Sequence, residues 1–177
     1  MAISLSLGLL VLRLVAGLTM AAHGLQKLVP WSGGPGFTKM TQALRAQGFK
    51  PAWFWASLAI LGELGGGISV AFGFLTPLGA AGIFGAMIMA VFKTHWKNGF
   101  WLNKHGYEYA LLRLIVAVTL GLTGPGSYSL DALFGIALPG TLLFSVLAVA
   151  SLLIDIIGMI ISRQPAMKPT EAASHAS

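Results

Sequence analysis

A single carboxylate, Glu63, lies at the centre of a long apolar run of this 177-residue sequence, and two arginines, Arg13 and Arg113, lie inside two other apolar runs. Inside a bilayer, an unpaired charge is disfavoured by roughly 2.5–3.5 kcal/mol or more. Arginine does not readily lose its proton, so a carboxylate is its most favourable partner. The sequence therefore predicts that Glu63 forms an ion pair with Arg13 or Arg113 near the middle of the membrane.

Three glycines, Gly65 to Gly67, follow this carboxylate after a single leucine. On a helix, Gly66 and Gly67 lie three and four residues beyond Glu63, and so on the same face. Either the backbone of another helix packs there, as the GxxxG spacing of Gly62 and Gly66 allows, or a small ligand does. Two interpretations follow: a structural ion pair that fixes helix register, or a polar cavity that binds a ligand or relays protons.

Further polar side chains gather near the ends of the apolar runs: His23, Lys27, His95, Asn98, His105, Tyr107 and Glu108, with His175 in the C-terminal tail. His23 and Lys27 are four residues apart and share a face if their helix continues by one turn. His23 and Glu63 are the candidate acid–base groups. No histidine pair has the H-x-x-x-H or H-x-x-E-H spacing, so no metal site is predicted.

The elements that position these residues follow from composition. The chain is 56% hydrophobic and 9% charged, whereas soluble domains carry roughly 25% charged residues. A bilayer span needs about 20 mostly apolar residues. Five spans are predicted, at about residues 3–22, 52–75, 76–94, 107–123 and 138–161. Each must be helical to satisfy its backbone in lipid, so we expect an all-α integral membrane protein, in which the first run is retained as a span.

The basic residues predict the orientation of these spans. Nine of the 11 fall in loops or a tail on one side: Lys27, Lys39, Arg45, Lys50, Lys93, Lys97, Lys104, Arg163 and Lys168. The positive-inside rule then places the N-terminus outside and the C-terminus in the cytoplasm. This asymmetry accounts for the net charge of +6 without a nucleic-acid partner. The absence of cysteine excludes disulfides, thiol relays and cysteine-ligated clusters.

The first cytoplasmic loop contains a second pattern. In "GFTKMTQALRAQGF", Phe37, Met40 and Leu44 share a helical face, which predicts a short interfacial helix that ends at Gly48. An irregular polar loop is the alternative. The tail, residues 164–177, is small and polar and is predicted to be disordered in the cytoplasm.

Several motifs together resemble the DoxX family of small bacterial membrane proteins. They are "LRLVAGLTMAAHGLQKL", "LGELGGG", "FKTHWKNGFW", "GYEYALLRL" and "TGPGSYSLDAL", in order over about residues 5–133. The family pattern falls on Arg13, His23, Gly24, Lys27, Glu63, Gly66, Asn98, Gly99, Phe100, Glu108, Tyr109 and Gly124. The resemblance implies a four-helix membrane domain over residues 1–135, which makes residues 136–163 an additional transmembrane helix.

The resemblance also implies a plasma-membrane protein linked to quinone-dependent sulfur or thiosulfate oxidation, or to oxidative-stress complexes. A quinone suits such a bundle, because its ring and tail are apolar and its two carbonyls need a few donors. The candidate ligand-binding residues are Arg13, Lys27, Arg113, Gly66, Gly67, Asn98 and Glu108, and Glu63 and His23 are the candidate catalytic residues.

Other functions stay open at this point. The first alternative is a non-catalytic structural or assembly subunit, and the second is a small carrier. Whether the chain is an enzyme is likewise open. The partners expected are the lipid bilayer, a quinone, and either other membrane redox subunits or a second copy of the chain.

Overall fold

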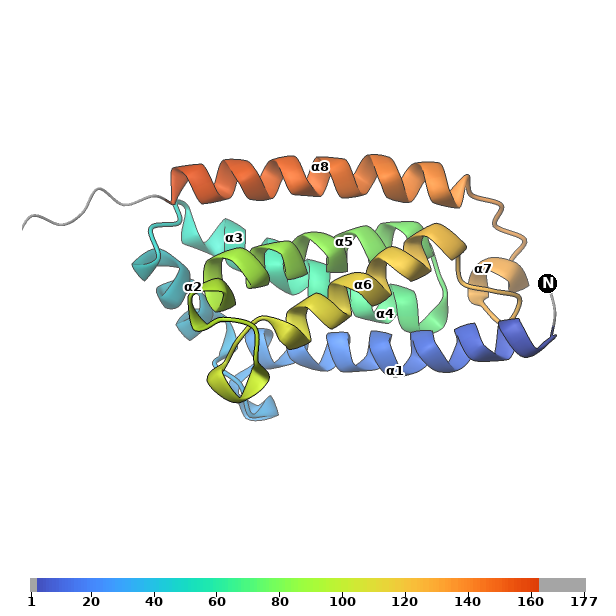
Figure 1. Ribbon diagram of the computed structural model, residues 1–177, viewed down its shortest axis with the longest axis horizontal. Coiled ribbons are helices and arrows are strands. Elements are labelled where there is room, and N and C mark those ends of the chain that lie inside the picture. The colour runs from blue at the N-terminus through green and yellow to red at the C-terminus, as the bar shows by residue number, and fades with distance from the viewer. Residues whose placement is uncertain (1–2, 163–177) are drawn as a thin grey trace, which may run out of the picture.

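A computed structural model describes residues 3–162, which fold into an elongated bundle of helices with no strand among them (Figure 1). The bundle helices are α1 (Ile3–Leu28), α3 (Ala52–Ile60), α4 (Gly66–Phe72), α5 (Thr76–Met89), α6 (Glu108–Thr123) and α8 (Gly140–Ile161). Two π-helical turns, η2 (Leu61–Gly65) and η3 (Ala90–His95), connect α3 to α4 and extend α5. The loops hold α2 (Gly36–Ala46), α7 (Leu130–Leu133) and the short turns η1 (Pro30–Ser32), η4 (Trp96–Asn98) and η5 (Leu102–Lys104).

The length and composition of these helices confirm an all-helical membrane protein. Within the described residues, four continuous helical stretches are long and apolar enough to cross a bilayer: Ile3–Leu28, Ala52–Phe72, Thr76–Asn98 and Gly140–Ile161. The remaining predicted span corresponds to α6, which has 16 residues. At 1.5 Å per residue it measures about 24 Å, shorter than the roughly 30 Å of a hydrocarbon core. In Figure 1, α6 still runs beside α5 along the bundle.

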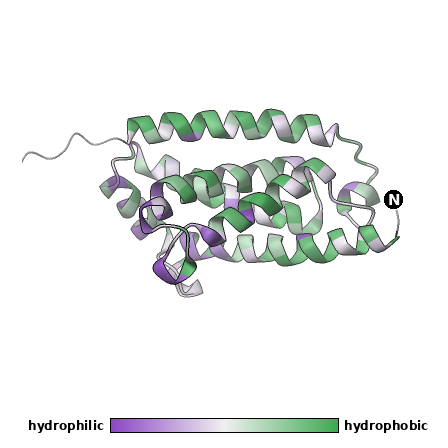
Figure 2. Ribbon diagram, viewed as in Figure 1, coloured by the Kyte–Doolittle hydropathy of each residue, from purple (hydrophilic) through white to green (hydrophobic). Residues whose placement is uncertain are grey.

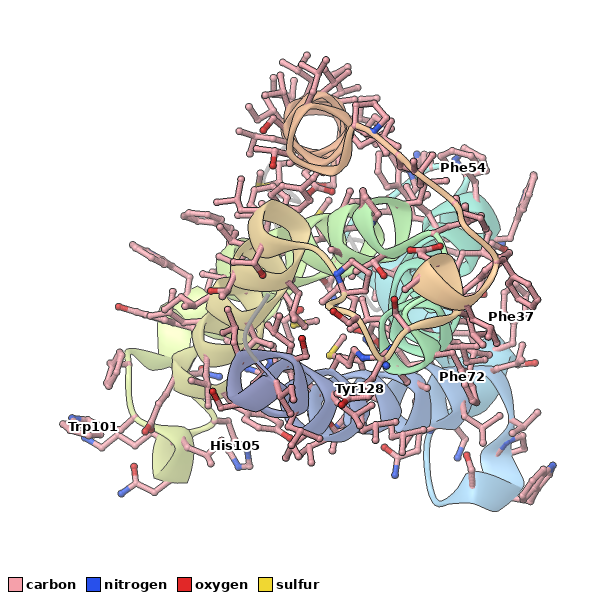
Figure 3. All side chains as sticks on the ribbon, turned by 90° about the vertical axis from the view of Figure 1, so that its right-hand side faces the viewer. Phe37, Phe54, Phe72, Trp101, His105 and Tyr128 are labelled. Carbon is pink, nitrogen blue, oxygen red and sulfur yellow. The ribbon has the colours of Figure 1, made fainter. Side chains whose placement is uncertain are left out.

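The helices pack in a definite order around α5. This helix contacts α4, α6 and α8, whereas α1 packs chiefly against α4 and only slightly against α6. Figure 3 shows α8 apart from the others on one side of the bundle, with side chains projecting around much of its circumference. Many of them are exposed and apolar, among them Leu142, Val146, Val149 and Leu153. So large an exposed apolar surface is typical of contact with lipid.

The two ends of the bundle differ in polarity. Figure 2 shows that hydrophilic residues gather at the end opposite the N-terminus, where α2 and the segment between η3 and α6 lie. We term this the basic end, because it holds Lys27, Lys39, Arg45, Lys50, Lys93, Lys97 and Lys104. Arg163, Lys168 and the predicted disordered tail lie outside the described residues. The other end is formed by the α4–α5 turn and α7.

A helix is present in the first loop as α2, and its position at the membrane interface stays a prediction. Its apolar face carries the buried Leu44 and the partly buried Phe37 and Met40. These side chains pack with Phe49 and Trp55 into a small core of their own. A contact with the protein thus stabilises α2, a helix too short to be stable alone.

At the opposite end, α7 fixes the α4–α5 turn. Gly73 has a positive φ of 63°, which favours glycine. Asp131 of α7 accepts hydrogen bonds from the Leu75 amide (2.8 Å) and from the Thr76 amide and hydroxyl (both 3.3 Å). A carboxylate from a distant segment therefore caps the N-terminus of α5, satisfying amides that have no partner inside the helix.

Candidate functional site

Glu63 lies on the π-helical turn η2, a type of turn that is frequent at functional sites. Its side chain is buried, and its Oε1 forms an ion pair with Lys27 Nζ at 2.5 Å. The other carboxylate oxygen, Oε2, is buried and has no hydrogen-bond partner among the described residues. The prediction that Glu63 pairs with Arg13 or Arg113 is therefore wrong, because the partner is Lys27.

The register of α1 against the second span explains this correction. Built on the backbone, a Cβ at Gly17 would meet Ala71, one at Gly67 would meet Ala21, and one at Gly24 would meet Leu64. In two antiparallel helices, the numbers of residues that lie at the same level add to a constant. Here each contacting pair adds to 88. Glu63 therefore faces the level of residue 25, between His23 and Lys27. The predicted register assumed that the first span ends near residue 22, but α1 continues to Leu28.

The glycines beside Glu63 are places where helix backbones meet. A Cβ at Gly66 would lie 2.6 Å from the Gly79 carbonyl oxygen of α5. A Cβ at Gly67 would lie 2.6 Å from the Gly17 carbonyl oxygen of α1. Real Cβ atoms do not approach backbone atoms so closely, so a neighbouring helix packs directly against each of these two glycines. A ligand-binding role for Gly66 or Gly67 stays a prediction.

Arg13 lies toward the opposite end of the bundle, away from the level of Glu63. Its side chain is buried, and an Nη1 hydrogen donates to the Ala71 carbonyl at 3.3 Å. A Cβ at Gly73 would collide with the guanidinium. Asp131, which caps α5, is close enough to act on its charge. Arg13 thus links α1 to the end of α4 before the α4–α5 turn, and a ligand contact by Arg13 stays a prediction.

His23 and Arg113 do come together, through Tyr109. The rings of His23 and Tyr109 lie edge to face with centroids 6.1 Å apart. The Arg113 guanidinium lies 3.7 Å from the centroid of the Tyr109 ring and also donates a hydrogen bond to its hydroxyl. His23 is within electrostatic range of Arg113, Glu63 and Lys27. The structure therefore assembles four of the predicted site residues, with Tyr109 as a fifth member, into one polar cluster between α1, α6 and η2.

A cavity of about 240 Å³ adjoins this polar cluster. It is a cleft between α1 and α6, which make few contacts with each other. The walls are mostly apolar, with Leu12, Ala16 and Met20 on one side and Leu112 and Val116 on the other. Its polar lining comes from Tyr109 and Arg113 of α6 and from Thr19 of α1. An apolar cleft with a few polar groups is typical of sites for small organic ligands.

Asn98 and Glu108, two further predicted ligand-binding residues, organise the loop before α6. The Asn98 amide donates to the His105 carbonyl at 3.1 Å, and His95 Nδ1 lies 2.8 Å from the same oxygen. Glu108 accepts a hydrogen bond from the Leu102 amide at 2.9 Å. Each side chain therefore has a structural partner in this loop. A direct ligand contact by either residue stays a prediction. Among residues 3–162, no group of three potential metal ligands gathers.

Two residues of interest are not among the predicted catalytic or ligand-binding residues, although the family pattern includes one of them, Tyr109. Tyr109 precedes Arg113 by one helical turn, so the i, i+4 spacing already predicts their contact. Asp155 lies in the middle of the last apolar run, and it is buried with Oδ2 unpartnered among the described residues. A lone carboxylate inside an apolar span is itself a signal of function.

Comparisons with known proteins agree with the resemblance seen in the motifs. The model of the DoxX family matches residues 8–96, a segment that holds Arg13, His23, Lys27 and Glu63. The inner membrane protein YqjF of Escherichia coli (strain K12) is 30% identical over 126 residues, which cover 71% of this chain and 91% of that protein. No solved structure matches the chain.

Proposed function

Because the chain belongs to the DoxX family, we propose that it is an inner-membrane protein that binds a quinone in the cleft between α1 and α6. In this role it serves a membrane redox system as an accessory subunit. The observation that carries the proposal is the cleft itself, whose apolar walls adjoin the polar cluster of His23, Lys27, Glu63, Tyr109 and Arg113. The same proposal treats residues 1–135 as the family domain and α8 as an addition to it.

The residues of the cleft fit such a ligand chemically. A quinone ring is flat and apolar, and its carbonyls accept hydrogen bonds. Arg113 has five N–H donors, of which one is given to the Tyr109 hydroxyl, so others can serve a carbonyl. The volume of about 240 Å³ suits a ring, while the cleft opens between two helices toward lipid, where an isoprenoid tail would lie. Arg113 and Tyr109 would hold the ring.

The remaining cluster residues supply proton chemistry. Reduction of a bound quinone to the quinol consumes two electrons and two protons, with the electrons supplied by a partner redox subunit. His23 contacts Tyr109 and can hold or release a proton beside the cleft. Glu63 and Lys27, within electrostatic range, form a charged pair that can exchange protons with His23 and with the basic end.

We expect Arg113→Gln to weaken quinone binding at least tenfold, which corresponds to about 1.4 kcal/mol. The reason is the loss of the charged donors that face the cleft. The measurement is equilibrium binding of decylubiquinone to protein in nanodiscs, with empty nanodiscs as the blank. Tyr109→Phe should weaken binding less, because it keeps the ring. Arg45→Gln, the same change on the exposed face of α2, should bind like the unaltered protein. If decylubiquinone binds equally to all four proteins, the cleft is not its site.

A second candidate function is that of a non-catalytic assembly subunit. It is favoured by the close backbone contacts at Gly66 and Gly67, which are typical of glycines in packed helix interfaces. In that case the unaltered protein would show no saturable decylubiquinone binding. Substitutions in the cleft would then alter only its association with partner subunits.

The proposal also includes an orientation, with the N-terminus outside and the basic end in the cytoplasm. Because the chain has no cysteine, single introduced cysteines can report on this directly. Ser127→Cys, near α7, should react with a membrane-impermeant maleimide added to spheroplasts. Asn103→Cys, in the exposed loop before α6, should react only after the membrane is permeabilised. The reverse pattern would place the polar cluster on the outer side.

A further inference from the structure

A second and larger cavity lies apart from the cleft between α1 and α6. It is a groove of about 410 Å³ between the second span, α5 and α8. Glycines form much of its lining, with Gly62, Gly65 and Gly66 on the second span and Gly79, Gly82 and Gly85 on α5. The volume falls within the roughly 300–1,000 Å³ of ligand sites, and the walls are mainly apolar. The family model ends at residue 96, so α8 contributes a wall that this match does not cover.

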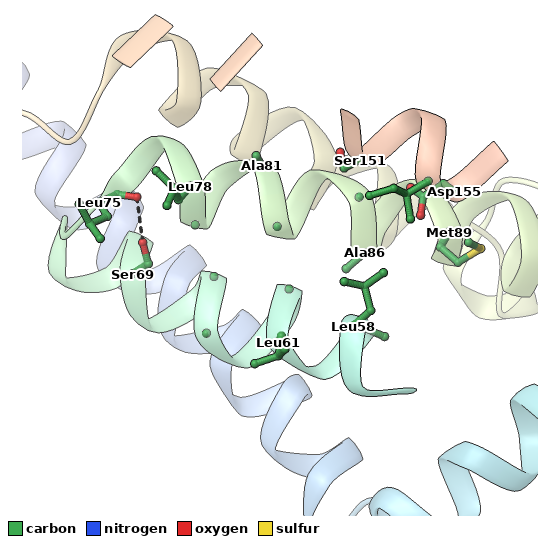
Figure 4. A pocket seen from close by; sticks show the side chains of 18 of the residues that line it. Leu58, Leu61, Ser69, Leu75, Leu78, Ala81, Ala86, Met89, Ser151 and Asp155 are labelled. Atoms are coloured by element: carbon green, nitrogen blue, oxygen red, sulfur yellow. Dashed lines mark hydrogen bonds between the residues drawn. The ribbon is translucent and has the colours of Figure 1, made fainter. Parts of the chain in front are cut away.

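One end of the groove holds a buried carboxylate. Asp155 of α8 is 5% exposed, and its Oδ2 has no hydrogen-bond partner among the described residues. The oxygen lies beside α5, where a Cβ built on Gly85 would be 3.6 Å from it. Figure 4 shows Asp155 near Met89 at this end, with Ser69 and Leu75 at the other end. From Leu75 to Met89 along α5 the groove extends about 20 Å.

Within residues 3–162, Asp155 has no compensating charge beside it. Among the described residues, no charged side chain lies close enough to act on it. Ser151, one turn earlier on α8, directs its hydroxyl to the Ala148 carbonyl at 2.9 Å. A buried polar atom without a partner is unfavourable by about 1–3 kcal/mol. A ligand that brings a positively charged hydrogen-bond donor would remove this deficit, and its apolar chain would occupy the rest of the groove.

We propose that the groove between the second span, α5 and α8 is a binding site for a lipophilic amine, whose ammonium group pairs with Asp155 and whose alkyl chain extends toward Leu75. This site is independent of the quinone cleft, since the two cavities share no lining residue. The ligand enters sideways from the lipid, because the groove lies between helices at the surface of the bundle.

The chain offers a well-matched pair of variants to test this site. Gly65 lines the groove, and a Cβ built on it meets nothing within 4 Å. Gly65→Leu therefore adds bulk to the groove without a collision in the backbone. Gly8 on α1 also has nothing within 4 Å and lies outside the groove. Gly8→Leu is therefore the matched control, because it makes the same change at a position outside the groove.

The experiment measures the binding of dodecylamine to protein in phosphatidylcholine nanodiscs, and compares it with the binding of dodecanol, a neutral analogue of equal chain length. Binding to empty nanodiscs is subtracted from both. We expect the unaltered protein to prefer the amine at least tenfold. Asp155→Asn should abolish that preference and leave dodecanol binding within twofold. Gly65→Leu should remove binding of both probes, whereas Gly8→Leu should change neither.

Equal binding of amine and alcohol by the unaltered protein would overturn the proposal. The groove would then bind alkyl chains without recognising an ammonium group. Undiminished amine binding by Gly65→Leu would also overturn it, since the probe would then lie elsewhere. If Asp155→Asn fails to fold, the amine preference of the unaltered protein and the Gly65→Leu and Gly8→Leu pair still decide the question. None of these outcomes depends on quinone binding.

Discussion

Replacing Lys27 with methionine is expected to lower the free energy of unfolding by about 2 kcal/mol. The change leaves Glu63 buried without its counter-charge, and removal of one partner of a buried pair typically destabilises by about 3–5 kcal/mol. We take a smaller value because the Lys27 side chain is 27% exposed. The measurement is unfolding by SDS titration in mixed micelles. Lys39→Met, on the exposed face of α2, is the matched control and should leave stability unchanged.

A double substitution identifies the partner of Glu63. Lys27→Met together with Glu63→Gln should recover most of the lost stability, because neither charge is then buried alone. Arg13→Gln together with Glu63→Gln should show no such recovery, since Arg13 contacts Ala71 and Gly73. Recovery with Arg13→Gln and none with Lys27→Met would restore the ion pair predicted from the sequence and contradict the observed register.

Gly67→Leu is expected to have the largest effect of the substitutions considered, namely loss of folded monodisperse protein. A side chain at this position would enter the backbone of α1 at Gly17 and Ala21, and a packed helix interface cannot move aside without losing its other contacts. Gly66→Leu should behave in the same way against Gly79 of α5. The yield of folded protein after size-exclusion chromatography measures both effects.

Gly65→Leu is the matched control for these two variants, because its position has open space. It should fold with normal yield. Normal folding of Gly67→Leu would mean that α1 and α4 do not pack through their glycines. The space beside Glu63 would then be available to a ligand after all.

Much of the fold could be predicted from the sequence, because hydrophobic runs of membrane length leave little choice but helices. The end of the first helix was harder to predict. The polar residues His23, Gln26 and Lys27 are typical of a loop, yet in the structure all three lie in α1, which continues to Leu28. His23 and Lys27 then form one side of the polar cluster. That difference moved the register and with it the partner of Glu63.

The sequence predicts which residues belong to the candidate site better than it predicts how they are arranged. Glu63, His23, Lys27 and Arg113 are recognisable as unusual residues in apolar surroundings, and they do cluster. Whether Gly66 faces a cavity or a neighbouring backbone depends on which helix lies opposite, and one sequence does not contain that information. The cleft and the groove likewise arise from the spacing between helices, which side-chain packing alone decides.

The most direct test of the quinone cleft is photolabelling. A quinone with a ring azide would be irradiated with the protein in nanodiscs, and the labelled residues would be mapped by mass spectrometry. We expect label on residues 12–20 of α1 and residues 109–120 of α6, with displacement by excess decylubiquinone. Label confined to the α5–α8 groove, or label that decylubiquinone does not displace, would contradict a quinone site between α1 and α6.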